Sequence, residues 1–124
     1  MRESEELQEQ IQKIIEQGKL VLVEGIKDKK ALEQLGIERV VTLRRRAIYK
    51  VVEDIVNKTK DCIILTDLDT EGKKLYKTIN SELSQRGVRV DNHFRNFLFK
   101  KTKLRQIEGI ANYLERITIK PIDF

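Results

Sequence analysis

The feature that most constrains this chain is a short apolar run followed closely by two aspartates. Residues 62–65 read Cys-Ile-Ile-Leu, which is too short for a helix and has no polar face. Such a run predicts a strand buried on both sides, as in a parallel sheet. Asp67 and Asp69 follow it, and Gly72 comes just before a helical pattern. We therefore expect the two acids at the carboxyl end of a core strand, where open α/β sheets bind ligands.

Two carboxylates this close need a compensating interaction. At about 4 Å and an effective dielectric constant of about 20, two like charges repel by about 4 kcal/mol. Either one acid holds a proton or a cation lies between them, and Mg²⁺ commonly binds through one or two carboxylates. The alternative is that Asp67 and Asp69 only cap the helix that follows, whose amino terminus favours negative charge.

The same pattern occurs once more, nearer the amino terminus. Residues 20–23 read Leu-Val-Leu-Val and are followed by Glu24 and Gly25, and Asp28 stands where the next helix should begin. The carboxyl ends of parallel strands lie at one edge of a sheet. Glu24 is therefore expected to meet Asp67 and Asp69 in a site of three carboxylates.

The remaining segments alternate in a regular way. A helical stripe over 3–17 ends at Gly18, a weaker strand covers 39–43, and a helix starts near Ile48. Residues 88–90 read as a last short strand, and apolar spacing predicts a helix from Ile107 to Leu114. Alternating strands and helices predict an α/β fold with about four mainly parallel strands and helices on both faces. We expect a single domain over 1–124, comprising a helix at 3–17, a core at about 19–91 and a helical extension at 92–124.

The charge balance points to a polyanionic partner. The chain holds 25 Lys and Arg against 20 Asp and Glu, a net charge of +5, while acids gather at a strand end. This combination suggests nucleic acid held near a metal ion. The alternative is that the basic residues only form solvated surface. The residues we expect to contact phosphates are Lys27, Arg44, Arg45, Arg46, Lys100, Lys101 and Lys103.

Other classes are disfavoured by what the sequence lacks. One cysteine cannot form a disulfide framework, and no apolar stretch reaches the length of a membrane span, so we expect a cytoplasmic protein without a membrane partner. No G-x-x-x-x-G-K-[ST] segment is present, which argues against a P-loop NTPase. His93 is the only histidine, and the sequence assigns it no role.

Together the two acidic motifs resemble a Toprim domain. The first motif matches residues 21–25 with Asp28, and the second matches residues 63–69 with Gly72, so the resemblance covers about 19–91. It implies a three-layer, Rossmann-like fold in which Glu24 is the general acid or base and a possible metal ligand. It also implies that Asp67 and Asp69 hold Mg²⁺, with Gly25, Asp28 and Gly72 in supporting positions.

The resemblance is to small stand-alone Toprim proteins, including ribosomal-RNA maturation nucleases, and to the Toprim module of primases and topoisomerases. It implies a Mg²⁺-dependent nuclease (a hydrolase) or nucleotidyl-transfer enzyme acting on RNA or DNA, with RNA processing as one setting. The 124 residues show no zinc-binding segment and no second domain, so we do not expect topoisomerase or self-sufficient primase activity. The alternative is a non-catalytic module that binds nucleic acid or nucleotide with Mg²⁺ and acts with a partner protein.

Overall fold

Four short strands form one sheet at the centre of the molecule. The computed structural model describes residues 2–118, and in this part of the chain every pair of neighbouring strands is parallel. The predicted α/β class is confirmed, and the sheet is wholly parallel rather than mainly so. In chain order the strands are β1 (Leu20–Val23), β2 (Val40–Thr42), β3 (Asp61–Leu65) and β4 (Arg89–Val90), and they lie in the order β2-β1-β3-β4.

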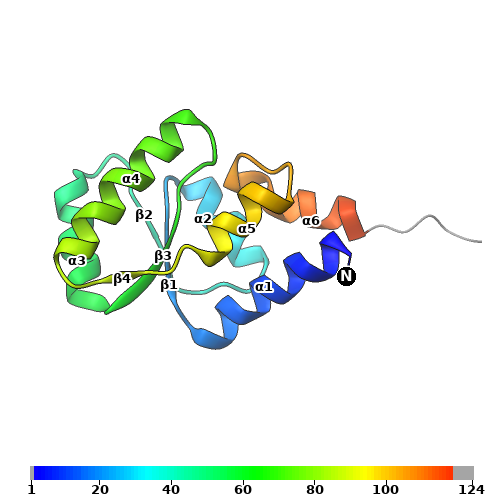
Figure 1. Ribbon diagram of the computed structural model, residues 1–124, viewed down its shortest axis with the longest axis horizontal. Coiled ribbons are helices and arrows are strands. Elements are labelled where there is room, and N and C mark those ends of the chain that lie inside the picture. Colours follow the sequence, from blue (N-terminus) through cyan, green and yellow to red (C-terminus); the bar gives the residue numbers. More distant parts are fainter. Residues whose placement is uncertain (1, 119–124) are drawn as a thin grey trace, which may run out of the picture.

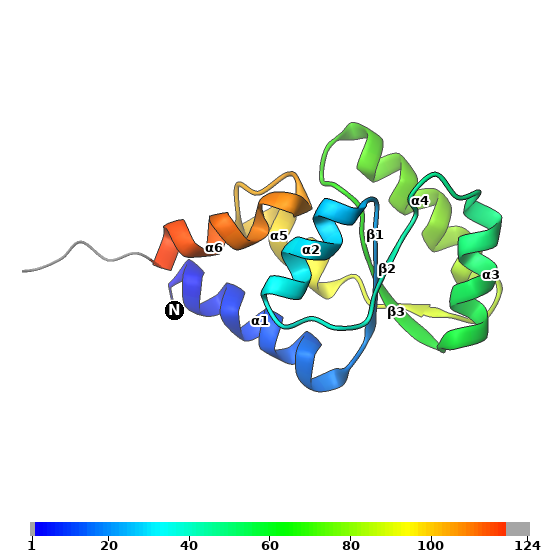
Figure 2. The ribbon, with the colours of Figure 1, turned by 180° about the vertical axis from the view of Figure 1, so that it is seen from behind.

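Helices cover both faces of this sheet, which gives the three layers predicted from the sequence. Figures 1 and 2 show α3 and α4 on one face and α1, α2, α5 and α6 on the other. The helices are α1 (Glu3–Gln17), α2 (Ile26–Gln34), α3 (Ile48–Lys58), α4 (Thr70–Gln85), α5 (His93–Lys101) and α6 (Ile110–Thr118), with a 3₁₀ turn, η1 (Ile107–Gly109), before α6.

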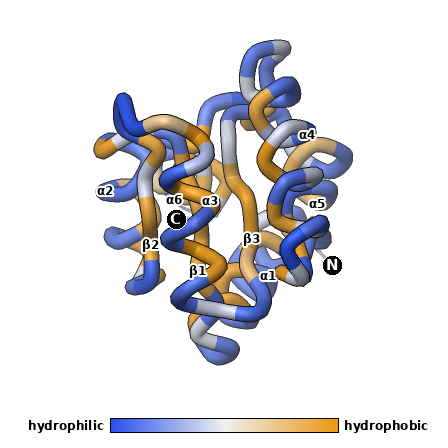
Figure 3. The backbone as a smooth tube through the Cα atoms, turned by 90° about the vertical axis from the view of Figure 1, so that its left-hand side faces the viewer, coloured by the Kyte–Doolittle hydropathy of each residue, from blue (hydrophilic) through white to orange (hydrophobic). Residues whose placement is uncertain are grey.

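Strands β1 and β3 are apolar throughout because their side chains pack into two cores, one on each face of the sheet. Alternate side chains of a strand point to opposite faces, so Val21 and Ile63 pack with α1, α2, α5 and α6, whereas Leu22 and Ile64 pack with α3 and α4. Figure 3 shows β1 and β3 as apolar segments in the middle of a largely hydrophilic exterior. Burying one such side chain fully is worth about 1.5–3 kcal/mol. The strand pair β1–β3 is thus a rigid support for the residues that follow it.

The chain reverses its direction of travel across the sheet between β1 and β3. From β1 it crosses to β2 on one side, and it then returns to place β3 on the other side, with Val23 opposite Leu65. In open parallel sheets such a reversal leaves a crevice at the carboxyl ends of the two strands, and ligands bind there. Glu24 and Asp67 are the acids that follow these two strand ends.

The described part of the predicted helical extension, 92–118, forms α5, η1 and α6. The sequence analysis delimited a helix only from Ile107 to Leu114 and set no bounds for α5, whose Phe94 and Leu98 are buried against the sheet, while Phe99 is exposed. Helices α1 and α6 pack side by side although they lie at opposite ends of the described chain (Figures 1 and 2). Residues 119–124 of the predicted extension lie outside the described residues. No helix in the described range is long and apolar enough to cross a bilayer.

Candidate functional site

A hydrogen bond joins the two acidic motifs at the carboxyl ends of β1 and β3. The Asp67 backbone N–H donates to Glu24 Oε2 at 2.6 Å, which ties the loop after β3 to the end of β1. Both residues are half-buried. The structure therefore brings together the acids of the two motifs, 43 residues apart in sequence.

Asp67 is oriented from the other side by the carboxyl-terminal segment. Its Oδ1 accepts a hydrogen bond from the backbone N–H of Ile107 at 2.9 Å, at the start of η1. Next to it, the Leu68 N–H donates to the Arg105 carbonyl at 2.7 Å. The segment before α6 is thus bound directly to the acidic loop and helps to shape it.

Asp69 caps helix α4. Its Oδ1 accepts a hydrogen bond from the Gly72 N–H at 2.8 Å, and the residue is exposed. The capping alternative thus describes Asp69 but not Asp67. Glu24, Asp67 and Asp69 each use one carboxylate oxygen for a backbone N–H, and among the described residues the second oxygen of each accepts no hydrogen bond. These second oxygens remain available to a ligand.

Gly72 lets α4 begin directly against the acidic loop. A Cβ on this residue would lie 1.9 Å from the Asp67 carbonyl oxygen, a distance that no side chain tolerates. The Thr66 hydroxyl also donates to the Gly72 carbonyl at 2.6 Å, within the buried turn. Glycine at this position therefore allows the close approach that holds Asp67 and Asp69 next to each other.

Asp28 adds a fourth carboxyl group to this region. Its Oδ2 accepts a hydrogen bond from the Gly25 N–H at 3.0 Å in the first turn of α2, and the residue is 7% exposed. Burial raises the pKa of Asp28 to about 6, and the negative charges of Asp67 and Glu24 also raise it. The Gly25 N–H opposes this shift only in part.

Arg95 contacts the acidic loop and is a residue that the sequence reasoning missed. It lies on α5, is 6% exposed, and donates from Nη1 to the Thr66 carbonyl at 2.5 Å and from Nη2 to the Asp67 carbonyl at 3.0 Å. Its guanidinium carbon lies 4.6 Å from the centre of the Tyr76 ring. Arg95 thus fixes the backbone on which Asp67 stands. No motif marks it, since the second acidic motif ends at Gly72, 23 positions earlier.

The surroundings of Glu24 and Asp67 disfavour the charged forms of both carboxyl groups. Burial raises the pKa of Glu24, and the charges of Asp67 and Asp69 raise it further. Burial likewise raises the pKa of Asp67, with Asp69 and Glu108 adding to the effect. Arg95 lowers both pKa values, but not enough to reverse the shifts. A bound cation would relieve this repulsion.

The donor set fits Mg²⁺ held by few protein ligands. Within residues 2–118 no three His, Cys, Asp or Glu side chains are placed to hold one ion together. Mg²⁺ usually keeps several waters and binds through one or two carboxylates plus phosphate oxygens. Asp67 and Asp69, one residue apart and each already oriented by a backbone N–H, are the pair that could hold it, with Glu24 beside them.

The three arginines at 44–46 lie at the same edge of the sheet, but they make different contacts. The Arg44 N–H donates to the Glu24 carbonyl at 3.0 Å, so this loop adjoins the end of β1. Arg44 and Arg45 are exposed and have positive φ angles of 31° and 60°, an uncommon conformation for non-glycine residues. Arg46 instead pairs with Asp54 of α3. Arg44 and Arg45 are therefore the better placed of the three to meet a ligand.

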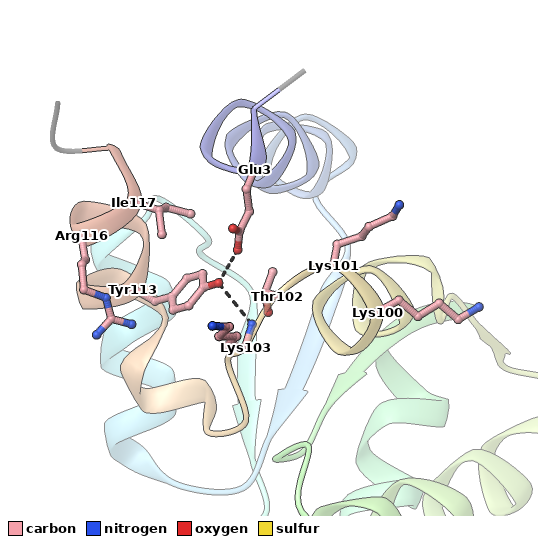
Figure 4. Close-up of a pocket in the computed structure, with 8 residues that line it drawn as sticks. All are labelled: Glu3, Lys100, Lys101, Thr102, Lys103, Tyr113, Arg116 and Ile117. Carbon is pink, nitrogen blue, oxygen red and sulfur yellow. Dashed lines mark hydrogen bonds between the residues drawn. The ribbon is translucent and has the colours of Figure 1, made fainter.

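The other predicted basic residues lie in two places, on α2 and around the end of α5. Lys27 is exposed in the first turn of α2, three residues after Glu24. Lys100, Lys101 and Lys103 line a hollow of about 560 Å³ between α1, the end of α5 and α6 (Figure 4). His93 is exposed at the start of α5, and its N–H donates to Asp91.

Comparison with known proteins identifies the family. A model of the Toprim domain matches residues 18–92, more than half of the chain. The chain belongs to the Toprim domain family. The matched range contains Glu24, Asp67 and Asp69, whereas α5, η1 and α6 fall beyond its end. This Toprim protein therefore carries its acids in the family's core and builds part of their surroundings from a segment outside it.

The relatives of this Toprim protein are small proteins of similar extent. A UPF0292 protein of Methanocaldococcus jannaschii is 34% identical over 108 residues, covering 84% of each chain. A UPF0292 protein of Thermoplasma volcanium is 34% identical over 104 residues, covering 82% of this chain and 87% of its own. A solved structure of a protein from Aquifex aeolicus superposes with a TM-score of 0.77 at 36% identity, covering 88% of this chain and 99% of its own. Membership of the Toprim family associates the chain with Mg²⁺ binding and with nucleic acids.

Proposed function

We propose that this Toprim protein is an enzyme of Mg²⁺-dependent phosphodiester chemistry on RNA or DNA, a nuclease or a nucleotidyl transferase, with RNA processing as one setting. The observation that carries the proposal is the 2.6 Å hydrogen bond from the Asp67 N–H to Glu24 Oε2. It joins Glu24, a carboxylate that would move a proton, to the loop that carries the two aspartates, which would hold a metal ion.

The two aspartates would hold Mg²⁺ through their second oxygens. Asp67 is fixed by Ile107 and Asp69 by Gly72, so neither carboxylate has to be ordered when the ion binds. When bound, Mg²⁺ neutralises charge on the phosphate and orients the reacting groups. The protein contributes to that chemistry by holding the two carboxylates in a fixed geometry before the ion binds.

Glu24 would move the proton. In hydrolysis, a P–O bond forms to the attacking water oxygen, the P–O bond to the leaving oxygen breaks, and one proton passes from the attacking to the leaving oxygen. Burial and the neighbouring acids raise the pKa of Glu24 towards the range in which a carboxyl group can both accept and donate a proton. Lys27, Arg44 and Arg45 would hold the phosphates on either side.

The test is cleavage or transfer on labelled RNA and DNA with and without Mg²⁺, using wild type and Glu24→Gln. The glutamine keeps an oxygen that can accept a hydrogen bond from the Asp67 N–H, so the contact between the two motifs should be preserved. We expect turnover by the variant to fall by about 10²–10⁴-fold, the usual contribution of a positioned acid or base. The matched control is Glu33→Gln, an exposed acid on α2, which should leave turnover unchanged.

The second candidate is a non-catalytic module that binds nucleic acid for a partner protein. It is favoured by the observation that no three acidic, histidine or cysteine side chains in the described range are placed around one ion. Wild type that binds nucleic acid with Mg²⁺ but turns over neither RNA nor DNA would overturn the enzyme proposal and support this one. Equal turnover by wild type and Glu24→Gln would leave an enzyme but remove Glu24 from its mechanism.

A further inference from the structure

Two adjoining hollows lead away from the carboxylates along the carboxyl-terminal segment. One, of about 470 Å³, includes Asp69 and is lined by residues 103–106, by η1 and by α6. The other, of about 560 Å³, continues between α1, the end of α5 and α6. The residues common to both are Lys103, Tyr113 and Arg116. The two hollows meet at these residues, between the loop 102–106 and α6, and we call them together the α6 groove.

The centre of the α6 groove is fixed by Tyr113. Its hydroxyl donates to the Glu3 carboxylate of α1 and accepts a hydrogen bond from the Lys103 N–H at 3.2 Å (Figure 4). Tyr113 is 7% exposed, and the Arg116 guanidinium carbon lies 5.3 Å from the centre of its ring. The backbone of the loop and the face of α6 are therefore held together where Lys103 and Arg116 lie.

Positive charge dominates the groove from one end to the other. Lys103 and Arg116 line both hollows, Arg105 lines the one beside Asp69, and Lys100 and Lys101 line the far one. Figure 4 shows Lys100 and Lys101 extending outward from α5, at the rim rather than at the centre. Arg105 donates to the Thr102 and Leu104 carbonyls of its own loop. The acids present are Glu3, which receives the Tyr113 hydroxyl, and Asp69, at the end where the metal would bind.

We propose that the α6 groove binds the backbone of a single-stranded nucleic acid and leads it to the carboxylates at Asp69. This inference rests on the proposed function and adds the path of the substrate. A positively charged groove that follows the backbone is the usual means of binding single strands. The two hollows, of about 560 and 470 Å³, are open to solvent, as a surface that an extended strand crosses must be. The strand's phosphates contact Lys103 and Arg116 as it passes Tyr113.

The test compares two variants with equal loss of charge. Lys103→Gln with Arg116→Gln removes two cations from the groove, whereas Lys58→Gln with Lys77→Gln removes two exposed cations from α3 and α4 on the other face of the sheet. Binding of a short labelled single strand is followed by fluorescence anisotropy in EDTA over a range of salt concentrations. We expect the groove variant to bind at least 10-fold more weakly and to lose about 1.4 units of salt slope, about 0.7 for each phosphate contact. The control should match wild type.

A charge-conserving variant separates charge from folding. Lys103→Arg with Arg116→Lys should keep affinity and salt slope near those of wild type, while all variants should show wild-type melting. Equal loss in the groove and control variants would overturn the proposal, as would binding of the matching duplex as tightly as the single strand. If wild type cleaves with Mg²⁺ and the groove variant keeps the same KM, the groove fails and the proposed function stands. If nothing is cleaved but the groove variant alone loses binding, the proposed function fails and the groove stands.

Discussion

At the scale of single residues, the acids of this Toprim protein differ in which backbone N–H donates to one oxygen of each carboxylate. Asp67 and Asp69 have the same chemistry and lie one residue apart, yet Asp69 caps α4 and Asp67 is bound by the Ile107 N–H. The sequence predicts the acids, because strand, acid and glycine follow one another twice. It does not predict Ile107 as a partner of Asp67, since almost every residue has a backbone N–H and no sequence pattern marks the one that donates.

Asp28 should make folding pH-dependent in the absence of metal. Its folded pKa of about 6 lies above the ordinary 3.8, so the folded state binds the proton more tightly than the unfolded state. The contribution of Asp28 to stability is therefore greatest below pH 4, declines as the pH rises towards 6, and stays lowered above it, by up to about 3 kcal/mol. Asp28→Asn keeps an acceptor for the Gly25 N–H and removes the charge.

Chemical denaturation in EDTA at several pH values between 4 and 8 measures this effect. Asp28→Asn should exceed wild type in stability above pH 6 and should decline less between pH 4 and 6. Asp54→Asn is unsuitable as a control, because Asp54 pairs with Arg46. Glu33→Asn, an exposed change on the same helix, serves instead and should keep the wild-type pH profile. Parallel profiles for Asp28→Asn and wild type would contradict the assignment.

At the scale of elements, the fold of the core was predictable and the carboxyl-terminal segment was only partly so. The runs at 20–23 and 62–65 gave β1 and β3, because strands buried on both faces leave a continuous apolar signature. Within the predicted helical extension at 92–124 only a helix at 107–114 was delimited, and α5 was not, although its Phe94, Phe97 and Leu98 all pack into one core. Their spacing of three and four residues is the signal that could have found it.

Helix α5 matters to the site through Arg95, the buried cation behind the acidic loop. Arg95→Met would leave the Thr66 and Asp67 carbonyls without their donor, at about 1–3 kcal/mol for each buried acceptor. We expect Arg95→Met to lower the free energy of unfolding by several kcal/mol and Arg95→Lys, which keeps the charge but not the two-pronged geometry, to lower it less. Denaturant titration measures both, with exposed Arg89→Met as control. An Arg95→Met variant as stable as Arg89→Met would show that the hydrogen bonds of Arg95 to the Thr66 and Asp67 carbonyls do not contribute to stability.

At the scale of the whole molecule, one sheet edge gathers groups that the sequence keeps far apart. Acids from the ends of β1 and β3, an arginine loop after β2 and the segment 103–107 meet there. The edge was predictable, since parallel strands end together, and so was the meeting of Glu24 with the second motif. Whether the carboxylates act on one ion depends on side-chain positions that strand topology does not fix.

Mg²⁺ should stabilise the entire fold through this edge. The folded state holds Asp67 and Asp69 together against their mutual repulsion, and an ion that binds only the folded state raises stability by mass action, by about 2.7 kcal/mol at one hundred times Kd. For a domain of this size that is a rise in Tm of several degrees.

Asp67→Asn with Asp69→Asn should remove the Mg²⁺ response, because the amides still accept hydrogen bonds from the Ile107 and Gly72 N–H groups but bind the ion poorly. Without metal, the same variant should melt no lower than wild type, since the repulsion is gone and the caps remain. Calorimetry with MgCl₂ against NaCl of equal ionic strength makes the measurement, and Glu33→Gln serves as the charge control. An equal rise in Tm for the double variant and wild type would place the ion elsewhere in the molecule.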